Sequence, residues 1–371
     1  MRVLLPQPSP RPILASDPIP SLGALWVRER AVAQLNRPAR GSALLAVLWL
    51  SAALSAIAFS VATSVRGETE RASTASDGLR AYYLATASVD RALLWIFWGS
   101  ELGGTRYYQP PMPWLHFNYP TGAADVEIIP ETAKMNINTA APADLVRVLI
   151  AAGAIPEQAQ RVTQGIIAWR SQGPEAAAMP GLGAGNSGSG PTFAAPHASF
   201  QEIEELLLVP GMTPELFYGS FSRDPQGQLV PRGGLRDCFS VYGTNDRFDV
   251  NTAHPALLLA LGINPGAVAA IVAMRRATPF RSVGQLAAMG LSGPGFQRLG
   301  VGGNTVWTLR ATAYARMANG RRSDLTRAVS ATIKFLPPDY TPAYQYLRWY
   351  DDSSSIQYAV NPQNPEAQPV P

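Results

Sequence analysis

The sequence of 371 residues contains one cysteine and three histidines, and only 15% of its residues are charged. A single Cys238 excludes an intramolecular disulfide framework, and it cannot form a cysteine-based metal cluster by itself. Catalysis or metal binding based on clustered histidines is not expected either, because His116, His197 and His254 are the only histidines in the sequence. We interpret all three as packing or surface residues, and Cys238 as a small buried apolar residue.

The sequence also lacks a basic excess outside its N-terminus. Lys and Arg number 30 against 26 Asp and Glu, and residues 1–41 alone hold six arginines against two acidic residues. The rest of the chain therefore carries 24 residues of each sign. A neutral chain of this length, enough for two or three domains, argues against a general nucleic-acid-binding protein.

A long uncharged segment follows this basic leader, because no charged residue occurs between Arg40 and Arg66. As a helix it would span about 37 Å, more than the ~30 Å of a membrane's hydrocarbon core. We predict a transmembrane helix over residues 42–65, with residues 1–41 in the cytoplasm and the main domain outside it, which in a bacterium is the periplasm. A cleaved secretory signal is the alternative, but its apolar region is usually shorter.

The helical pattern continues beyond the membrane segment. Apolar residues recur at helical spacing from Leu79 to Phe97, and no proline interrupts them. We therefore predict one helix from about Ser42 to Trp98, first membrane-spanning and then amphipathic. Trp95, Phe97 and Trp98 at its end should be covered by a sheet.

The start of this helix resembles a pilin-type junction. Arg40-Gly41 before an apolar helix resembles a prepilin peptidase site, cut between Gly41 and Ser42. The resemblance implies a type IV pilin-like protein, although most pilins have a Phe or Met in place of Ser42 and a shorter leader. Most also have a glutamate at the fifth mature position, thought to pair with a neighbour's N-terminal amine, and here that position is Ala46. Its absence resembles the minor pseudopilin K family of type II secretion systems, proposed to occupy the pseudopilus tip.

A motif occurs twice in the chain, as Met-Asn-Ile-Asn-Thr-Ala at residues 135–140 and as Phe-Asp-Val-Asn-Thr-Ala at residues 248–253. Each copy continues with a proline at a helix start, a glycine in a helix–helix turn, a helix ending in arginine and a Phe-led helix. These paired residues are Pro142 and Pro255, Gly153 and Gly262, Arg170 and Arg275, and Phe200 and Phe280. We predict helical repeats over residues 135–225 and 248–302, with Thr139 and Thr252 as helix N-caps.

The repeats are similar to helix-hairpin-helix modules, which bind DNA phosphates through backbone N–H groups. That role needs a positive field, and residues 131–225 contain five basic and nine acidic residues. The second copy is mildly basic. We expect protein contacts rather than DNA binding, and the pseudopilin K resemblance also implies a large helical insertion that begins near such segments. A membrane-anchored periplasmic DNA receptor of the competence type is the alternative function.

The predicted fold class is α+β, with the long N-terminal helix packed on an antiparallel sheet and a large helical region inserted into the sheet. Alternating β-rich segments at residues 114–119, 124–129, 305–316 and 323–335 predict the strands. The head would comprise residues 66–134 and 303–340. Between the repeats, residues 226–247 form a connecting segment with a short strand over Leu235–Tyr242. We predict a flexible loop over residues 173–192 and a flexible tail over residues 341–371.

No cofactor site is predicted. The glycine pattern of residues 183–188 lacks the strand and helix that a dinucleotide site requires. The resemblance leaves calcium binding open, with Asp224, Asp351 and Asp352 as candidate ligands but no defined calcium loop. We predict a non-enzymatic pseudopilin. The resemblance implies other minor pseudopilins, the major pseudopilin, prepilin peptidase and the inner-membrane assembly platform as partners.

Overall fold

A computed structural model describes most of the chain. The described residues are 42–101, 107–171, 198–223, 227, 229–288, 290, 292–303, 305–317, 319–337 and 339–353. Contacts divide the chain into two units, Met1–Glu70 and Arg71–Pro371. In the first unit the described element is the beginning of helix α2 (Ser42–Glu101). All strands and the remaining helices that have labels belong to the second unit.

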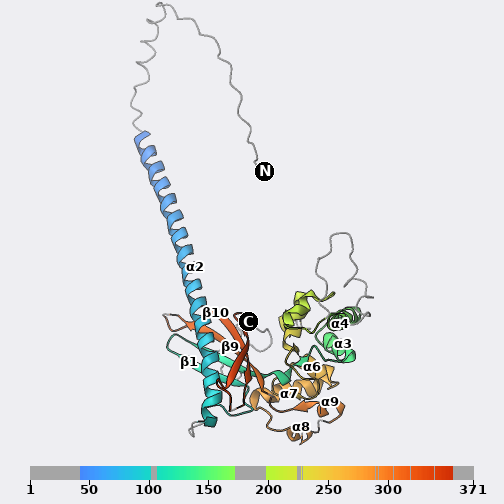
Figure 1. The fold of residues 1–371 in the computed structure, drawn as a ribbon. Coiled ribbons are helices and arrows are strands. Elements are labelled where there is room, and N and C mark those ends of the chain that lie inside the picture. The colour runs from blue at the N-terminus through green and yellow to red at the C-terminus, as the bar shows by residue number, and fades with distance from the viewer. Residues whose placement is uncertain are drawn as a thin grey trace, which may run out of the picture. The chain divides into compact units, whose positions relative to one another are not determined.

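Helix α2 runs without interruption, as Figure 1 shows in blue and cyan, and this confirms the prediction of one long helix. Within the second unit its buried side chains include Ala81, Ala85, Val89 and Ala92. This spacing places them on one side of the helix, where small side chains allow a close approach to the sheet. At the end of α2, Trp95 and Phe97 pack on the core of the sheet together with Ala85, Val89 and Ala92, as predicted, and the side chain of Trp98 is not among those described.

The sheet has five antiparallel strands in the order β1-β2-β9-β10-β11. Their bounds are β1 Trp114–Tyr119, β2 Gly122–Pro130, β9 Val306–Arg316, β10 Arg322–Phe335 and β11 Tyr344–Tyr350. The first four lie within two residues of the predicted strands. Because Pro130 of β2 lies opposite Trp307 of β9, the inserted region leaves and returns at the same end of two neighbouring strands. The predicted α+β fold class is confirmed.

Strand β11 corrects the prediction of a flexible tail over residues 341–371. It pairs with β10 from Phe335 to Ser330, and its Tyr346 hydroxyl donates to Asp90 Oδ1 of α2 at 2.9 Å. Alternating aromatic residues favour a strand here, which the polar composition of the whole segment obscured. Residues 354–371 lie outside the described residues.

The inserted region forms a second hydrophobic core of its own. Its elements are η2 Glu131–Ala133, β3 Met135–Asn136, α3 Pro142–Ala151, α4 Pro156–Arg170, η3 Ile203–Leu208, α5 Pro214–Tyr218, β4 Gly219–Arg223, β5 Leu229–Gly233, η4 Leu235–Asp237, β6 Phe239–Ser240, β7 Phe248–Asp249, α6 Pro255–Ala260, α7 Pro265–Ala277, α8 Gly284–Ala288, α9 Pro294–Gln297 and β8 Leu299–Gly300. The strand predicted over Leu235–Tyr242 is only the two-residue β6, preceded by η4. Residues 173–192, with the glycine pattern, lie outside the described residues.

The two motif copies have corresponding backbone arrangements. In the first, β3 pairs in parallel with β6, and in the second, β7 pairs in parallel with β8. Each hairpin turns at a glycine with positive φ, Gly153 at 104° and Gly262 at 87°, as the sequence predicted. The first copy therefore reaches residue 240, beyond the predicted boundary at residue 225.

Candidate functional site

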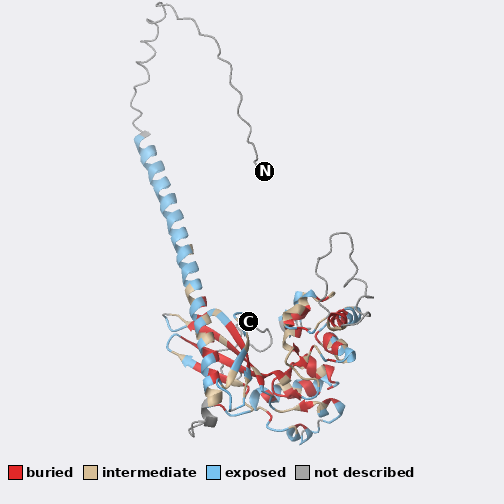
Figure 2. Cartoon of the chain, in the orientation of Figure 1, coloured by how far each residue is buried: buried red, intermediate tan, exposed pale blue. Residues whose placement is uncertain are grey.

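The beginning of helix α2 is exposed, as the pale blue in Figure 2 shows, and many of its exposed side chains are large and apolar. Its large apolar side chains from Leu44 to Val65 are 56–74% exposed. The most apolar 18-residue window has a mean hydropathy of 2.2, and none of it is buried, unlike the core helix of a soluble protein. Apolar surface of this extent requires an apolar environment. The helix therefore fits a single-pass membrane anchor.

The predicted processing junction lies at the start of this helix. Gly41 is outside the described residues, and α2 begins at Ser42. Ala46 lies about one turn into the helix and is exposed. Its methyl group adds no charge to a membrane-embedded surface, whereas an unpaired carboxylate there would be costly.

A second apolar surface lies on the head portion of α2. Leu79, Tyr83 and Leu94 are 56%, 62% and 50% exposed. At 100° per residue these three side chains lie within about 60° of one another, on the face roughly opposite the buried alanines. We name Leu79, Tyr83 and Leu94 the outer stripe. The exposed Asp90 lies on the same face between Tyr83 and Leu94, so Leu79 and Tyr83, about one turn apart, form the apolar part of this surface that is typical of contacts.

The asparagine of each motif copy makes the same pair of hydrogen bonds. Asn138 Oδ1 accepts from Phe200 N at 2.7 Å, and its Nδ2 donates to Phe200 O at 3.0 Å. Asn251 binds Phe280 in the same way, at 2.8 and 2.9 Å. An amide side chain has the one acceptor and the donors that a backbone unit needs. Each asparagine thus ties its motif to the Phe-led segment far along the chain.

The arginine at the end of the second hairpin helix completes the arrangement. Arg170 donates to Ile137 O and Ala140 O, at 2.7 and 2.6 Å. Arg275 donates to Val250 O and Ala253 O. These are the third and sixth residues of the second motif, as Ile137 and Ala140 are of the first. The guanidinium groups therefore satisfy motif carbonyls.

The prediction that Thr139 and Thr252 cap the first helices is wrong. Helix α3 begins at Pro142 with Ala141 as its N-cap and no side-chain cap. Helix α6 begins at Pro255, and the N-cap His254 accepts from Ala256 N. Proline at the first helical position sets both starts three residues after the threonines, so each N-cap lies two residues after its threonine. The threonine hydroxyls bind elsewhere: Thr139 accepts from Asn245, and Thr252 donates to Asp249.

The hairpins do not present the charge that a DNA phosphate requires. The first turn of α4, where a hairpin would meet phosphate, contains Glu157 and no basic residue. The first turn of α7 (Pro265–Ala277) is uncharged, and its arginines lie in the last turn. Because Arg170 and Arg275 bind motif carbonyls, the geometry favours packing over phosphate binding.

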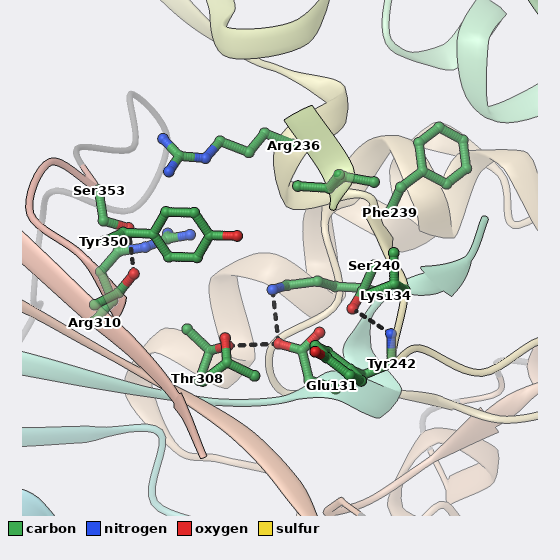
Figure 3. A pocket seen from close by; sticks show the side chains of 14 residues that line it. Glu131, Lys134, Arg236, Phe239, Ser240, Tyr242, Thr308, Arg310, Tyr350 and Ser353 are labelled. Carbon is green, nitrogen blue, oxygen red and sulfur yellow. Dashed lines mark hydrogen bonds and ion pairs between the residues drawn. The ribbon is translucent and has the colours of Figure 1, made fainter. Parts of the chain in front are cut away.

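A buried polar cluster connects the inserted region to the sheet (Figure 3). Lys134 Nζ lies 2.9 Å from Glu131 Oε1, which also accepts from the Thr308 hydroxyl of β9 at 2.6 Å. Arg310, also on β9, lies 3.3 Å from Glu127 of β2 and 2.6 Å from Asp237 of the insertion. Beside them is a cavity of about 50 Å³. These acids and bases pair with one another, which holds the insertion to the sheet.

Burial has opposite outcomes for the two glutamates of this cluster. For Glu131, burial favours a higher pKa, but the Lys134 ammonium and the hydroxyl donors hold the pKa below its ordinary value. For Glu127, burial dominates and raises the pKa to about 7, although Arg310 opposes the shift. Glu127 therefore titrates near neutrality in the folded protein.

The remaining residues considered from the sequence have structural contacts. His116 Nδ1 lies 2.8 Å from Asp125 Oδ1, and His254 is buried at the N-cap of α6, so the packing interpretation holds for both. His197 lies outside the described residues. Cys238 is fully buried, as predicted, and burial raises the pKa of its thiol.

The candidate calcium ligands do not form a site in the described part of the chain. The Oδ1 atom of Asp351 accepts from the Tyr82 hydroxyl at 2.8 Å and from Trp349 Nε1 at 2.9 Å. Among the described residues, no three His, Cys, Asp or Glu side chains are grouped to hold a metal. Asp224 lies outside them. Asp351 and Asp352 thus do not fit the six to eight oxygen ligands that calcium takes.

Comparisons with known proteins show similarity to one family model and to chains of solved structures. The family model described as type II secretion system (T2SS), protein K, matches residues 248–302. No curated protein matches the chain. Among solved structures, a chain from the crystal structure of the GspK-GspI-GspJ complex of the enterotoxigenic Escherichia coli type 2 secretion system is similar. That match has 17% identity and a TM-score of 0.43, and covers 79% of this chain and 99% of that chain.

The segment matched by the family model coincides with a structural unit. It begins at Phe248, the first residue of β7, and ends at Gly302, whose N–H donates to Asp249 Oδ1 at 2.8 Å. It therefore covers the second motif copy from its first strand to just beyond β8. Over residues 248–302, this match confirms the resemblance to protein K of type II secretion systems.

Proposed function

We propose that this protein is a minor pseudopilin at the tip of the type II secretion pseudopilus, where it initiates assembly and supports protein export across the outer membrane. The observation that carries the proposal is the protein K match over residues 248–302. Residues 42–65 hold the chain in the inner membrane, with the N-terminus in the cytoplasm and the head in the periplasm. This orientation follows from the arginines of the leader.

The tip position is supported by Ala46. A subunit without a carboxylate at this place cannot make the ion pair expected with the N-terminal amine of a subunit above it. It can still offer its own N-terminal amine, generated by cleavage before Ser42, to a subunit below. A subunit can therefore pair below this protein but not above it, as expected for the first subunit of a filament.

The outer stripe supports contact with the helices of other minor pseudopilins. Leu79→Arg should reduce their co-purification with the full chain in detergent, because a charge on a helix–helix interface must be desolvated. Ile150→Arg is the matched control, since Ile150 is 45% exposed but lies on α3 of the insertion. Equal recovery of partners with both variants would contradict a contact through this stripe.

The processing step is tested by the intact mass of the membrane-extracted protein, with and without co-expressed prepilin peptidase. We expect loss of residues 1–41 and a new N-terminus at Ser42. Gly41→Ile should block cleavage, whereas Gly23→Ile in the same leader should not. An uncut wild-type chain would contradict the pilin-type anchor and would favour the membrane DNA receptor.

The tip argument is tested separately at Ala46. Ala46→Glu supplies the missing carboxylate, and Ala46→Gln supplies a neutral side chain of the same size. We expect the Glu variant, and not the Gln variant, to enter the shaft, measured by its abundance in sheared pseudopili relative to the major pseudopilin. If both variants stay as scarce as the wild type, the carboxylate does not determine position.

A further inference from the structure

A larger cavity of about 220 Å³ lies between the segment before β1, the sheet and the second motif copy. Tyr108, Pro111 and Met112 line it from the first of these, and Trp307 lines it from β9. Asp249 and Thr252 line it from the second copy. The cavity is thus mostly apolar and aromatic, with one carboxylate.

The carboxylate of Asp249 is only 2% exposed. Its Oδ2 accepts from the Thr252 hydroxyl at 2.5 Å, and its Oδ1 accepts from Gly302 N at 2.8 Å. The corresponding residue of the first copy is Asn136, whose side chain donates to the carbonyl oxygens of Val241 and Gly243. A neutral amide therefore serves the same motif position. The carboxylate is therefore present at this motif position only in the second copy, where Asp249 lines the cavity.

The carboxylate of Asp249 and the aromatic rings near it favour a cation as the occupant of the cavity. The Tyr108 and Trp307 rings lie 6.1 Å apart at 69°, and such rings attract cations to their faces. Arg275 is the neighbouring cation that acts on Asp249, and its guanidinium is hydrogen-bonded to Val250 O and Ala253 O. Burial raises the pKa of the Asp249 carboxyl, although the Arg275 cation opposes the shift. Burial, and to a smaller extent the charge of Asp249, raises the pKa of the Tyr108 hydroxyl, which therefore stays neutral.

We propose that this cavity binds the side chain of a lysine or arginine presented by an extended segment of a protein partner. Its volume is below the about 300–1,000 Å³ of sites for drug-sized molecules and suits one long side chain. Aromatic walls are typical of sites that bind extended peptides. The carboxylate supplies the complementary charge. This site is independent of the tip position, because it uses no residue of α2.

The test uses the full chain in detergent micelles, labelled with fluorotryptophan and observed by ¹⁹F NMR. The Trp307 resonance is assigned by its loss in Trp307→Phe. Capped arginine and capped lysine are titrated through the millimolar range, where a single side chain is expected to bind. Capped citrulline is the neutral control, because it has the shape of arginine without the charge.

We expect both cations, and not citrulline, to shift the Trp307 resonance saturably. Asp249→Asn should weaken binding by about tenfold or more, because a hydrogen bond to a charged group is lost. The first copy shows that asparagine suits this position, and unchanged resonances of the other tryptophans would verify the fold. Affinity should fall on acidification, as Asp249 becomes protonated.

Three results would overturn the proposal. They are the absence of a shift with either cation, an equal shift with citrulline, and an unchanged affinity in folded Asp249→Asn. None of these depends on prepilin processing or on tip position, so a failure here leaves the proposed function untouched.

Discussion

Replacing Asn251 by alanine should lower the free energy of unfolding of the second motif copy more than any neighbouring surface substitution does. The substitution removes the acceptor of Phe280 N and the donor to Phe280 O. Asn251 is 5% exposed and Phe280 is 2% exposed, so water cannot replace the lost partners. An unsatisfied buried polar group costs about 1–3 kcal/mol, and two of them should lower the free energy of unfolding by about 2–6 kcal/mol. That is a large share of the about 5–15 kcal/mol typical of a folded protein.

Two matched variants separate the hydrogen bonds from the loss of an amide. Asn138→Ala removes the same pair of bonds in the first copy. Phe200 is as buried as Phe280, but Asn138 itself is only half-buried, so water can enter the space that its side chain leaves. We expect a smaller loss, about 1–2 kcal/mol. Asn118→Ala, on the exposed side of β1, should stay within about 0.5 kcal/mol of the wild type.

Urea unfolding of the full chain in detergent, followed by tryptophan fluorescence, measures these differences. Trp169 stacks on Phe200 with ring centroids 5.1 Å apart, so it also reports on the first copy. The midpoints are comparable where the urea dependence is unchanged. Equal midpoints for Asn251→Ala and Asn118→Ala would refute the role of the amide bonds. A larger loss for Asn138→Ala than for Asn251→Ala would refute the argument from burial.

Three further changes test the sheet and the polar cluster. Gly122→Ala should cost about 1–3 kcal/mol in urea unfolding, because its Cβ would lie 2.2 Å from Tyr314 O, whereas Gly266→Ala in an exposed helical turn should stabilise by about 0.5–1 kcal/mol. Lys134→Met should cost about 3–5 kcal/mol at neutral pH, because Glu131 loses its buried cation. The stability due to the lowered pKa of Glu131 is present above the ordinary carboxyl pKa and lost on acidification, and calorimetry should show this acid loss reduced in the variant. Because the pKa of Glu127 is raised to about 7, its contribution to stability should fall by up to about 3 kcal/mol between pH 4.5 and 7, and Glu127→Gln should remove that slope. An unchanged slope in Glu127→Gln would contradict the assignment.

Local patterns were enough to predict the main elements. The uncharged run after Arg40 and the helical spacing up to Phe97 belong to one helix, and both signals lie within α2 itself. Strands β1, β2, β9 and β10 likewise follow from alternation within each segment. The glycines of the hairpin turns could be placed because positive φ favours glycine wherever the turn occurs.

The N-cap prediction was wrong because a nearby proline fixes the helix start more strongly than a threonine does. Thr139 and Thr252 are good cap residues, but Pro142 and Pro255 already fix where a helix can begin. A proline at the first helical position places the cap immediately before it, where the chain has Ala141 and His254. The proline was the stronger signal and was available in the sequence.

The contacts of β11 were beyond local patterns, because its partners lie far away in the chain. The Tyr346 hydroxyl meets Asp90 across 256 positions, and Tyr82 meets Asp351 across 269. Only the folded sheet brings the strand beside α2. A polar composition after Thr341 therefore predicted a tail where tertiary pairing makes a strand.

The polar cluster was missed for a related reason, and its position says what it does. Glu131 and Lys134 have the spacing of an ordinary surface pair, and nothing local shows that Thr308 will bury them. Strands β2 and β9 pair with each other up to Pro130 and Trp307, so the sheet is complete without help from the insertion. The cluster lies where the insertion leaves the sheet, and within it Arg310 of β9 forms an ion pair with Asp237 of the insertion. Its buried charges therefore stabilise the attachment of the insertion to the sheet. Substitutions in the cluster should weaken this attachment before they destabilise the sheet.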